Sequence, residues 1–264
     1  MVEVIICGAR GKMGRAILEA AAGFKDLKIA GLVEAPGHPD VGRSISVGGA
    51  ALRVTSILPA VPRAVVIDFS SPQAAVARAR EACERGFPLV VGTTGLTQGQ
   101  VGKIAKAAKT IPVVRSSNMS LGVNVLWDLV YRAAKMLGSA ADVEIIEAHH
   151  GGKKDAPSGT ALSIADKVRE ARGEAGPQKL VHGREGLLGA RPRGEIGIHA
   201  VRGGDIAGDH TVLFAMQGER LELTHRAHGR EALARGALRA ALFAANAKAG
   251  LYGMNDVLGT GETR

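Results

Sequence analysis

The sequence predicts an α/β fold with a doubly wound parallel sheet, followed by an inserted α+β lobe with a mixed or antiparallel sheet. Over the first 120 residues, short runs of Val, Ile and Leu alternate with helical patterns and glycine turns. This alternation is typical of strand–helix–strand units in a parallel sheet. After Asn118, apolar and polar residues alternate along longer strands, which is typical of a mixed or antiparallel sheet.

The first lobe should contain five buried strands with helices between them. The strands are expected at residues 2–7, 27–34, 64–70, 87–95 and 111–118. Helical patterns follow the first, third and fourth strands, at residues 16–21, 74–83 and 97–109. Thr97 is a candidate cap for the last of these helices, because Thr side chains accept hydrogen bonds from amides at helix N-termini.

The second lobe is expected at residues 121–229, and residues 230–264 should return to the first lobe. Helices are expected at residues 122–137, 158–172 and 230–248, and strands at 142–150, 195–202, 210–216 and 220–227. A segment rich in Gly, Arg and Pro, residues 173–194, separates the second helix from the later strands. The Ala-rich helix at 230–248 should close the pattern.

The composition argues against several classes of protein. The net charge of +9 is compatible with nucleic-acid binding, but the basic residues are spread along the chain and only 3% of residues are aromatic. Few side chains can therefore stack on bases, and an anionic small ligand is the better interpretation. No apolar run approaches the ~18 residues of a membrane span, and we expect no signal peptide. Cys7 and Cys83 are the only cysteines, which excludes a disulfide scaffold and favours a cytoplasmic protein.

A glycine-rich loop, GARGKMG, joins the first strand to the first helix. Gly8, Gly11 and Gly14 stand three residues apart. The spacing differs from G-x-G-x-x-G, because Ala9 stands where the first glycine would fall. The glycines permit a tight turn and a close approach to a pyrophosphate, and the helix N-terminus supplies N–H groups.

Glu34 strengthens the prediction of a dinucleotide site. It ends the second strand, where an acid can accept hydrogen bonds from the adenosine ribose hydroxyls. Ala35 follows it, so that no arginine is placed there to pair with a 2′-phosphate, and NADH should be accepted. NADPH could still be tolerated through one of three nearby cations: Lys12, Arg10 or Arg43.

Two small polar segments follow the fourth and fifth strands: GTTG at residues 92–95 and SSNMS at residues 116–120. Ligands of open α/β sheets lie outside the carboxyl ends of the strands. These segments could line a nicotinamide pocket or could be ordinary turns, and their spacing leaves both interpretations open.

The segment EAHHGGKKDAPSGTAL, residues 147–162, allows three interpretations. A metal site is the first, but His149 and His150 are adjacent and point in opposite directions in an extended segment. No H-x-x-x-H or cysteine pair accompanies them, so we expect no metal. A solvated basic loop is the second interpretation.

Acid–base chemistry is the third and more specific interpretation. A histidine titrates near neutral pH and can pass a proton in either direction. Lys153 follows His149 across two glycines, which should let its ammonium fold back toward the imidazole. PSGTA then starts a helix whose first N–H groups, at Gly159 and Thr160, can bind a carboxylate. Asp155 is expected to hold the loop or to cap that turn.

These motifs resemble the 4-hydroxy-tetrahydrodipicolinate reductase family. EAHHGGKKDAPSGTA is similar to that family's signature segment, and the other motifs occur in the expected order: GARGKMG, GTTG, SSNMS, AVRGGDIAGDHTVLF and GLYGMNDVL. The resemblance spans essentially the whole chain. It implies a Rossmann domain at residues 1–120, a substrate-binding and oligomerisation domain at residues 121–229, and a homotetramer.

The resemblance also implies an activity. It is the NAD(P)H-dependent reduction of 4-hydroxy-tetrahydrodipicolinate to tetrahydrodipicolinate with loss of water, in lysine and diaminopimelate biosynthesis. Many bacterial members carry an arginine after the acid of the second strand, where this chain has Ala35. A strong preference for NADPH is therefore not expected, and no nucleic-acid or membrane partner is implied.

The resemblance assigns roles to individual residues. His149 is expected to donate and accept a proton, and Lys153 to donate one. The substrate carboxylates should bind three residues: His150, Gly159 and Thr160. The cofactor should contact Gly8, Ala9, Arg10, Gly11, Lys12, Met13, Glu34, Gly92, Thr93, Thr94, Ser116, Ser117, Asn118 and Met119.

Two other classes of protein remain open on the sequence. A two-lobed dehydrogenase acting on homoserine or an amino-acid aldehyde would share the nucleotide loop, but need not carry H-H-x-x-K followed by P-S-G-T. A non-catalytic nucleotide sensor or nucleic-acid-binding protein would fit the charge of +9. The latter should bind DNA in a salt-sensitive way.

Overall fold

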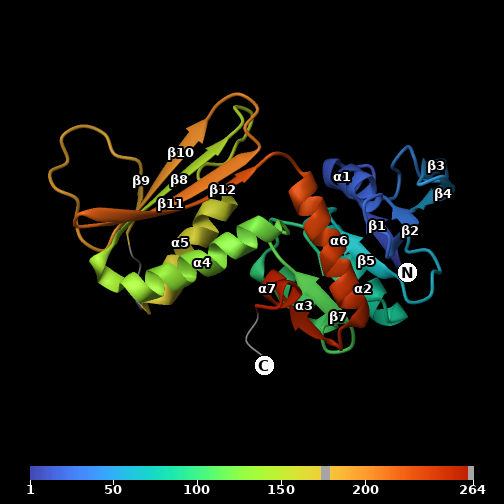
Figure 1. Cartoon of the computed structure of the whole chain (residues 1–264). Helices are drawn as coiled ribbons and strands as arrows, with labels where there is room; N and C mark the ends of the chain where they lie inside the picture. The colour runs from blue at the N-terminus through green and yellow to red at the C-terminus, as the bar shows by residue number, and fades with distance from the viewer. Residues whose placement is uncertain (174–178, 261–264) are drawn as a thin grey trace. The chain divides into compact units, whose positions relative to one another are not determined.

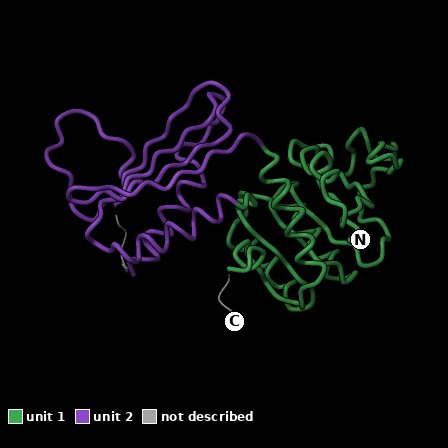
Figure 2. Tube along the Cα trace, viewed as in Figure 1, with its two compact units in different colours: residues 1–121, 230–264 green, residues 122–229 purple. Residues whose placement is uncertain are grey.

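A computed structural model describes residues 1–173 and 179–260 of the 264-residue chain (Figure 1). The chain forms two compact units (Figure 2): Met1–Leu121 with Arg230–Arg264 is unit 1, and Gly122–Gly229 is unit 2. The chain thus leaves unit 1 after Leu121 and re-enters it at Arg230.

Unit 1 is built on an eight-stranded sheet in the order β13-β7-β6-β5-β1-β2-β4-β3. The strands are β1 (Val2–Cys7), β2 (Leu27–Val33), β3 (Ser44–Val47), β4 (Ala50–Thr55), β5 (Val65–Asp68), β6 (Leu89–Val91), β7 (Pro112–Arg115) and β13 (Gly250–Tyr252). Neighbouring strands are parallel except for the antiparallel pair β3 and β4. The strand order changes direction between β1 and β5, which is where doubly wound sheets bind their ligands.

Helices cover both faces of this sheet. They are α1 (Lys12–Ala21), α2 (Pro72–Arg85), α3 (Gln98–Ala107), α6 (Glu231–Asn246) and α7 (Met254–Leu258). Successive residues of β1 point to opposite faces, so that Ile6 shares a core cluster with Leu238 of α6. Its neighbour Ile5 belongs to the cluster that contains Ile104 of α3. The sheet is therefore buried on both faces, as the apolar runs predict.

Unit 2 is built on a five-stranded sheet in the order β12-β11-β8-β10-β9. The strands are β8 (Asp142–His149), β9 (Leu180–His182), β10 (Ile196–Arg202), β11 (Gly208–Met216) and β12 (Glu219–Ala227). β10 pairs in parallel with β8 and β9, whereas β11 is antiparallel to β8 and β12. The sheet is thus mixed, and the predicted fold class is confirmed.

One face of the unit 2 sheet is covered by helices (Figure 1). These are α4 (Leu121–Leu137), which ends in the 3-10 turn η1 (Gly138–Ala140), and α5 (Gly159–Arg172). Ile145 of β8 and Phe214 of β11 pack with Ile164 of α5 in one buried cluster. The face of β8 that points to the helices also carries Glu147 and His149, because strand side chains alternate.

The structure corrects several predicted elements. The hairpin β3–β4 was not predicted, because Val54 is the one buried residue of its two strands and the hairpin has no buried apolar run. β9 lies in the Gly-, Arg- and Pro-rich segment, of which residues 174–178 lie outside the described residues. The Ala-rich helix is not the last element, contrary to the prediction, since β13 and α7 follow it in the chain. The strand predicted at 87–95 is only three residues long, β6.

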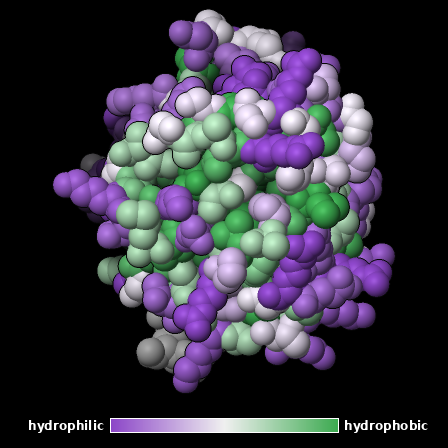
Figure 3. Space-filling view, turned by 90° about the vertical axis from the view of Figure 1, so that its right-hand side faces the viewer, coloured by the Kyte–Doolittle hydropathy of each residue, from purple (hydrophilic) through white to green (hydrophobic). Residues whose placement is uncertain are grey.

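The surface gives two further observations. The face on the right-hand side of Figure 1 carries hydrophobic side chains in its middle and hydrophilic ones around them (Figure 3). In the part of the chain that the structure describes, no helix has the length and apolar character to cross a membrane.

Candidate active site

The glycine-rich loop lies at the carboxyl end of β1 and turns directly into α1. Gly8 has a φ of 75°, which favours glycine, and its N–H donates to the Val33 carbonyl at 2.9 Å. A Cβ on Gly14 would lie 2.2 Å from the Gly8 carbonyl oxygen. The first turn of α1 can therefore pack on the loop only because Gly14 has no side chain.

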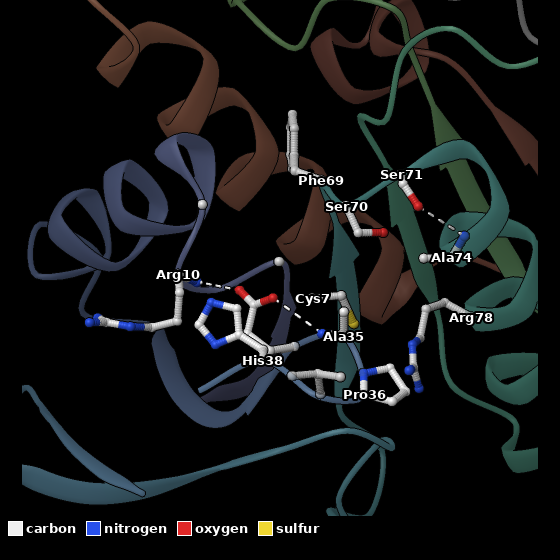
Figure 4. Close-up of a pocket in the computed structure, with 14 residues that line it drawn as sticks. Cys7, Arg10, Ala35, Pro36, His38, Phe69, Ser70, Ser71, Ala74 and Arg78 are labelled. Atoms are coloured by element: carbon white, nitrogen blue, oxygen red, sulfur yellow. Dashed lines mark hydrogen bonds between the residues drawn. The ribbon is translucent and has the colours of Figure 1, made fainter. Parts of the chain in front are cut away.

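Glu34 follows β2, and its carboxylate is fixed beside this loop. Its Oε1 accepts a hydrogen bond from the main-chain N–H of Arg10 at 2.6 Å, and its Oε2 accepts one from the main-chain N–H of Ala35 at 3.2 Å (Figure 4). The carboxylate borders a pocket of about 430 Å³. The remaining lining residues are Cys7, Gly8, Gly11, Val33, Pro36, His38, Phe69, Ser70, Ser71, Ala74 and Arg78.

Lys12 and Met13 do not line this pocket. Lys12 lines a second cavity of about 470 Å³, together with Arg15 of α1 and Arg230 before α6. Met13 packs against the core of unit 1. Neighbouring residues of one loop thus contribute to different parts of unit 1.

The GTTG segment closes the ends of β5 and β6. The Gly92 N–H donates to the Asp68 carbonyl at 3.0 Å, and the hydroxyl of buried Thr93 donates to Asp68 Oδ1 at 2.6 Å. Thr94 is exposed. Thr97 caps α3, as predicted, because its Oγ1 accepts a hydrogen bond from the Gln100 N–H at 3.3 Å. The Thr93 side chain is therefore structural, and Thr94 presents its side chain to solvent.

The SSNMS segment is held by its own hydrogen bonds. The Ser116 hydroxyl donates to the Asn118 carbonyl at 2.7 Å. The Met119 side chain is 1% exposed, and a Cβ on Gly236 of α6 would lie 1.7 Å from the Met119 carbonyl oxygen. Met119 is thus a core residue, whereas Ser117 is exposed. Ala9 is likewise a buried residue, with 0% exposure.

Asp68 is a buried acid that the sequence analysis did not single out. It ends β5, and its side chain is fully buried. Burial raises the pKa of Asp68, although hydrogen bonds from Thr93 and Ser70 act in the opposite direction. The signal in the sequence is one acid inside the apolar run AVVIDF, and its role is to join the ends of β5 and β6.

In unit 2, His149 is paired with a buried carboxylate. It is the last residue of β8, and its Nδ1 lies 2.6 Å from Glu147 Oε2. Glu147 is fully buried and His149 is 8% exposed. An ionised carboxylate only accepts hydrogen bonds, so this contact selects the tautomer with the proton on Nδ1. Nε2 is then the nitrogen that can exchange a proton.

Two other groups, with three donor nitrogens between them, hold Glu147 in its charged form. Arg202 of β10 donates from Nη1 and Nη2 to both carboxylate oxygens, at 2.7 and 2.8 Å, and the Ser158 N–H donates to Oε1 at 2.9 Å. Burial acts to raise the pKa of Glu147, but the hydrogen bonds from Arg202, His149 and Ser158 outweigh burial and lower it. The charged carboxylate therefore fixes the orientation of the imidazole.

A second histidine lies against the first. His210 of β11 packs edge-on against His149, with 5.2 Å between the ring centroids. Its Nε2 lies 3.0 Å from Ser158 Oγ, which accepts the Ala161 N–H and can therefore donate to the ring. Burial, and then the charge of a protonated His149, lower the pKa of His210 to about 4. His210 is thus neutral near pH 7.

Gly208 provides the space around His149 Nε2. A Cβ at this position would lie 3.0 Å from His149 Nε2. Because Gly208 also has a φ of 154°, a larger residue would be strained as well as crowded.

Lys153 is placed differently from the prediction. Its ammonium does not fold back onto His149 but forms an ion pair with Asp155, with both carboxylate oxygens at 2.9 Å from Nζ. The Asp155 carbonyl accepts a hydrogen bond from Arg202 Nη2 at 2.7 Å. Asp155 therefore holds the loop, as one of the two predictions states, and the cap of α5 is Ser158.

The start of α5 lies beside the Glu147–His149 pair. Ser158 binds both Glu147 and His210, and Gly159 and Thr160 form the first turn of the helix. The positive end of the helix dipole thus lies at the predicted carboxylate site. His150 is half-buried and next in the chain to His149.

Sequence reasoning missed Arg202 and His210 and gave no role to Glu147 and Ser158. Alternation along β8 places Glu147 on the face of His149, which was a usable signal. Arg202 lies opposite His149 in the β8–β10 register, and His210 lies opposite Glu147 in the β8–β11 register. Such pairings are set by the sheet and cannot be read from spacing along the chain. No group of three or more His, Cys, Asp and Glu side chains in the described residues could hold a metal ion.

Two family models together match nearly the whole chain. One, described as "Dihydrodipicolinate reductase, N-terminus", matches residues 2–119, and the other, described as "Dihydrodipicolinate reductase, C-terminus", matches residues 122–258. The chain belongs to the dihydrodipicolinate reductase family. The boundary between the matches falls where the chain passes from unit 1 to unit 2.

Individual relatives agree with this family assignment. A 4-hydroxy-tetrahydrodipicolinate reductase from Anaeromyxobacter sp. is 48% identical over 100% of both chains. The protein of the same name from Rubrobacter xylanophilus is 45% identical over 98% of both chains. Among solved structures, dipicolinate-bound dihydrodipicolinate reductase from Paenisporosarcina sp. has a TM-score of 0.77 and 26% identity, over 97% of this chain and 99% of that chain. A probable dehydrogenase from Thermotoga maritima, at 10% identity and a TM-score of 0.58, shares the fold.

Proposed function

We propose that this protein reduces 4-hydroxy-tetrahydrodipicolinate to tetrahydrodipicolinate with NAD(P)H and loss of water, in lysine and diaminopimelate biosynthesis. The observation that carries the proposal is the buried Glu147–His149 pair, 2.6 Å apart, at the start of α5. It lies in a chain whose relatives are named for this reaction.

Unit 1 fits a dinucleotide. The close-packed loop from Gly8 to Gly14 and the fixed carboxylate of Glu34 suit a pyrophosphate and a ribose. The cofactor contacts that we propose are main-chain groups from Gly8 to Met13, the Glu34 carboxylate, and the segments Gly92–Thr94 and Ser116–Met119. Reduced nicotinamide, when bound, would supply a hydride for carbon 4 of the substrate ring.

Unit 2 supplies groups for a dicarboxylate substrate. We assign its carboxylates to Lys153, His150 and the helix terminus at Gly159 and Thr160. Lys153 carries the positive charge, and the dipole of α5 adds a partial positive charge at its N-terminus. The ion pair with Asp155 keeps the Lys153 ammonium next to the turn that starts this helix.

His149 is positioned for the proton transfer. Loss of the 4-hydroxyl as water leaves a conjugated imine, and its reduction gives an enamine that needs a proton. Glu147 holds His149 Nδ1, so the proton is transferred at Nε2, with Lys153 Nζ as the alternative donor. Binding in one orientation supplies a large part of the rate, because the reacting groups are then already aligned.

The remaining properties follow from the same assignment. We propose that NADH is accepted, since Ala35 follows Glu34. A homotetramer is supported by exposed apolar residues on the sheet face of unit 2 that points away from the helices, such as Ile146 at 39% and Val201 at 48% exposure. A cytoplasmic location is supported by Cys7 and Cys83, which are both free thiols.

A coupled assay tests the reaction. The substrate is generated in situ from pyruvate and aspartate semialdehyde by the preceding synthase, and the absorbance of NADH is followed. Oxidation of NADH that depends on both the synthase and this protein is expected. A rate no higher than that without the protein would refute the reductase function.

The assignment of Lys153 has its own test. Lys153→Ala should lower kcat by orders of magnitude, about 10²-fold or more if Lys153 transfers the proton or clamps the substrate. The Kd for NADH should stay within about twofold, because the proposed nucleotide contacts lie in unit 1. Wild-type kcat in this variant would contradict the assignment.

A further inference from the structure

The arginines that line the pocket beside Glu34 are already paired with carboxylates. Arg10 Nε lies 2.6 Å from Asp40 Oδ2. The Arg78 guanidinium binds Glu81, and its Nη2 donates to the Ser56 carbonyl at 2.7 Å. Glu34 is therefore a carboxylate without a cationic partner among the lining residues, although two guanidinium groups lie in the same wall.

Asp40 interacts with more than Arg10. Its Oδ1 lies 3.6 Å from Arg43 Nη1, and its N–H donates to His38 Nδ1 at 3.2 Å. The hydrogen bond from Arg10, and then its charge, lower the pKa of Asp40, so the carboxylate is charged at neutral pH. Asp40 thus pairs closely with Arg10 and also contacts the more exposed Arg43, and its single negative charge balances one of these two guanidinium groups.

A ribose 2′-hydroxyl and a 2′-phosphate would meet this arrangement differently. A hydroxyl can donate to Glu34, whose two oxygens are held by main-chain amides. A phosphate would face that fixed negative charge, and Arg10 would have to leave Asp40 to bind it. Separating a charge-assisted pair at 2.6 Å reduces the gain from a new contact with phosphate.

We infer that Asp40 is a specificity-determining residue that disfavours NADPH by holding Arg10 and Arg43. This inference rests on the proposed function, because it requires the adenosine ribose to bind at Glu34. It goes beyond the identity of residue 35, since it assigns the discrimination to the ion pair between Arg10 and Asp40.

Calorimetric titration of the full chain with NADH and with NADPH tests the inference. The readout is the ratio of the NADPH Kd to the NADH Kd. The wild type should bind NADH more tightly, and Asp40→Asn should lower the ratio about tenfold or more, the size expected of one charge-assisted hydrogen bond. Asp40→Ala should lower it similarly. An unchanged ratio in both variants would overturn the inference, as would tighter binding of NADPH than NADH by the wild type.

Two further variants locate the effect. Arg10→Ala added to Asp40→Asn should remove most of the gain, because Arg10 is the guanidinium that Asp40 releases. If the double variant keeps the full gain, Arg10 is not the group released and the inference fails in its stated form. Asp26→Asn is the matched control: it changes the net charge equally, is exposed, and lies at the opposite end of β2 from Glu34. Its ratio should equal that of the wild type.

The failure of the inference can be distinguished from that of the proposed function. If NADH binds the wild type and Asp40→Asn leaves the ratio unchanged, only the role of Asp40 is overturned. If neither dinucleotide binds the wild type, the nucleotide site itself is wrong, and both proposals are overturned.

Discussion

Glu147 Oε2 and His149 Nδ1 lie 2.6 Å apart, two residues from each other on the same face of β8. Each of the four groups around this carboxylate donates to it: the imidazole, two guanidinium nitrogens and one main-chain amide. The contact therefore sets which nitrogen of His149 carries the exchangeable proton.

Glu147→Gln should impair turnover more than binding. A glutamine amide must direct its NH₂ group toward two donors, either Arg202 and Ser158 or Arg202 and His149, and it lacks the negative charge that fixes the imidazole. We expect kcat to fall about 10²-fold and the Kd for NADH to stay near wild type. Steady-state kinetics and calorimetry measure both quantities. Glu222→Gln, on exposed β12, is the control, and equal kcat values in the two variants would contradict the role of Glu147.

Gly208→Ala should act on the same imidazole from another direction. The new Cβ would lie 3.0 Å from His149 Nε2, which should displace the ring and lower kcat about tenfold or more. Gly203→Ala is the matched control, because a Cβ there would meet nothing within 4 Å. The assay should find Gly203→Ala near wild type, and a similar loss in both variants would show that loop perturbation alone explains the effect.

Protonation of His210 should lower the stability of the folded protein in mild acid. Its pKa of about 4 in the folded chain lies below the unfolded value of about 6.5. Folding therefore favours neutral His210, and its contribution is complete above about pH 6.5 and is lost as the pH falls toward 4. His210→Gln keeps a polar group for Ser158 and does not titrate. Melting temperatures between pH 7 and pH 4.5 should fall less in this variant than in the wild type.

A control separates His210 from acid effects in general. His182 is exposed at the end of β9, so His182→Gln should show the same pH dependence as the wild type. If all three proteins lose stability in parallel, the buried His210 does not contribute as stated.

Gly14→Ala should strongly destabilise unit 1, although it adds only one methyl group. The Cβ would lie 2.2 Å from the Gly8 carbonyl oxygen, and such overlap costs about 2 kcal/mol or more of the free energy of unfolding. Binding of NADH should also weaken, because the loop must move. Gly102→Ala, in the interior of α3 with nothing near its Cβ, should instead stabilise by about 1 kcal/mol. Urea denaturation should give a lower free energy of unfolding for Gly14→Ala, and a higher one for Gly102→Ala, than for the wild type.

The sequence predicted the buried parts of the fold better than the exposed ones. The central strands β1, β2 and β5 are apolar runs flanked by glycine or helix signals, and these patterns are local. β3, β9 and β13 are short and contain no buried residue, so that sheet pairing rather than their own composition makes them strands.

The residues of the candidate site also differ in how well the sequence predicts them. His149, Lys153 and Glu34 stand in recognisable motifs and could be named from the chain alone. Arg202, His210 and Asp40 could not, because the partner that gives each its role lies 30 or more residues away in sequence. The ion pair of Lys153 with Asp155 shows a further limit: two neighbouring charges satisfy each other before a longer turn back to His149 can form.

The division of unit 1 has a consequence for the order in which a ribosome can complete this protein. α6 and β13, which supply core residues such as Leu238 and the edge strand beside β7, are translated after every residue of unit 2. A nascent chain that ends at residue 229 would have all of unit 2 but an open face on the first sheet. The nucleotide-binding unit, most of which precedes unit 2 in the chain, should therefore be the last to reach its native state, and a nonsense mutation near residue 230 should prevent it from folding while leaving unit 2 complete in sequence.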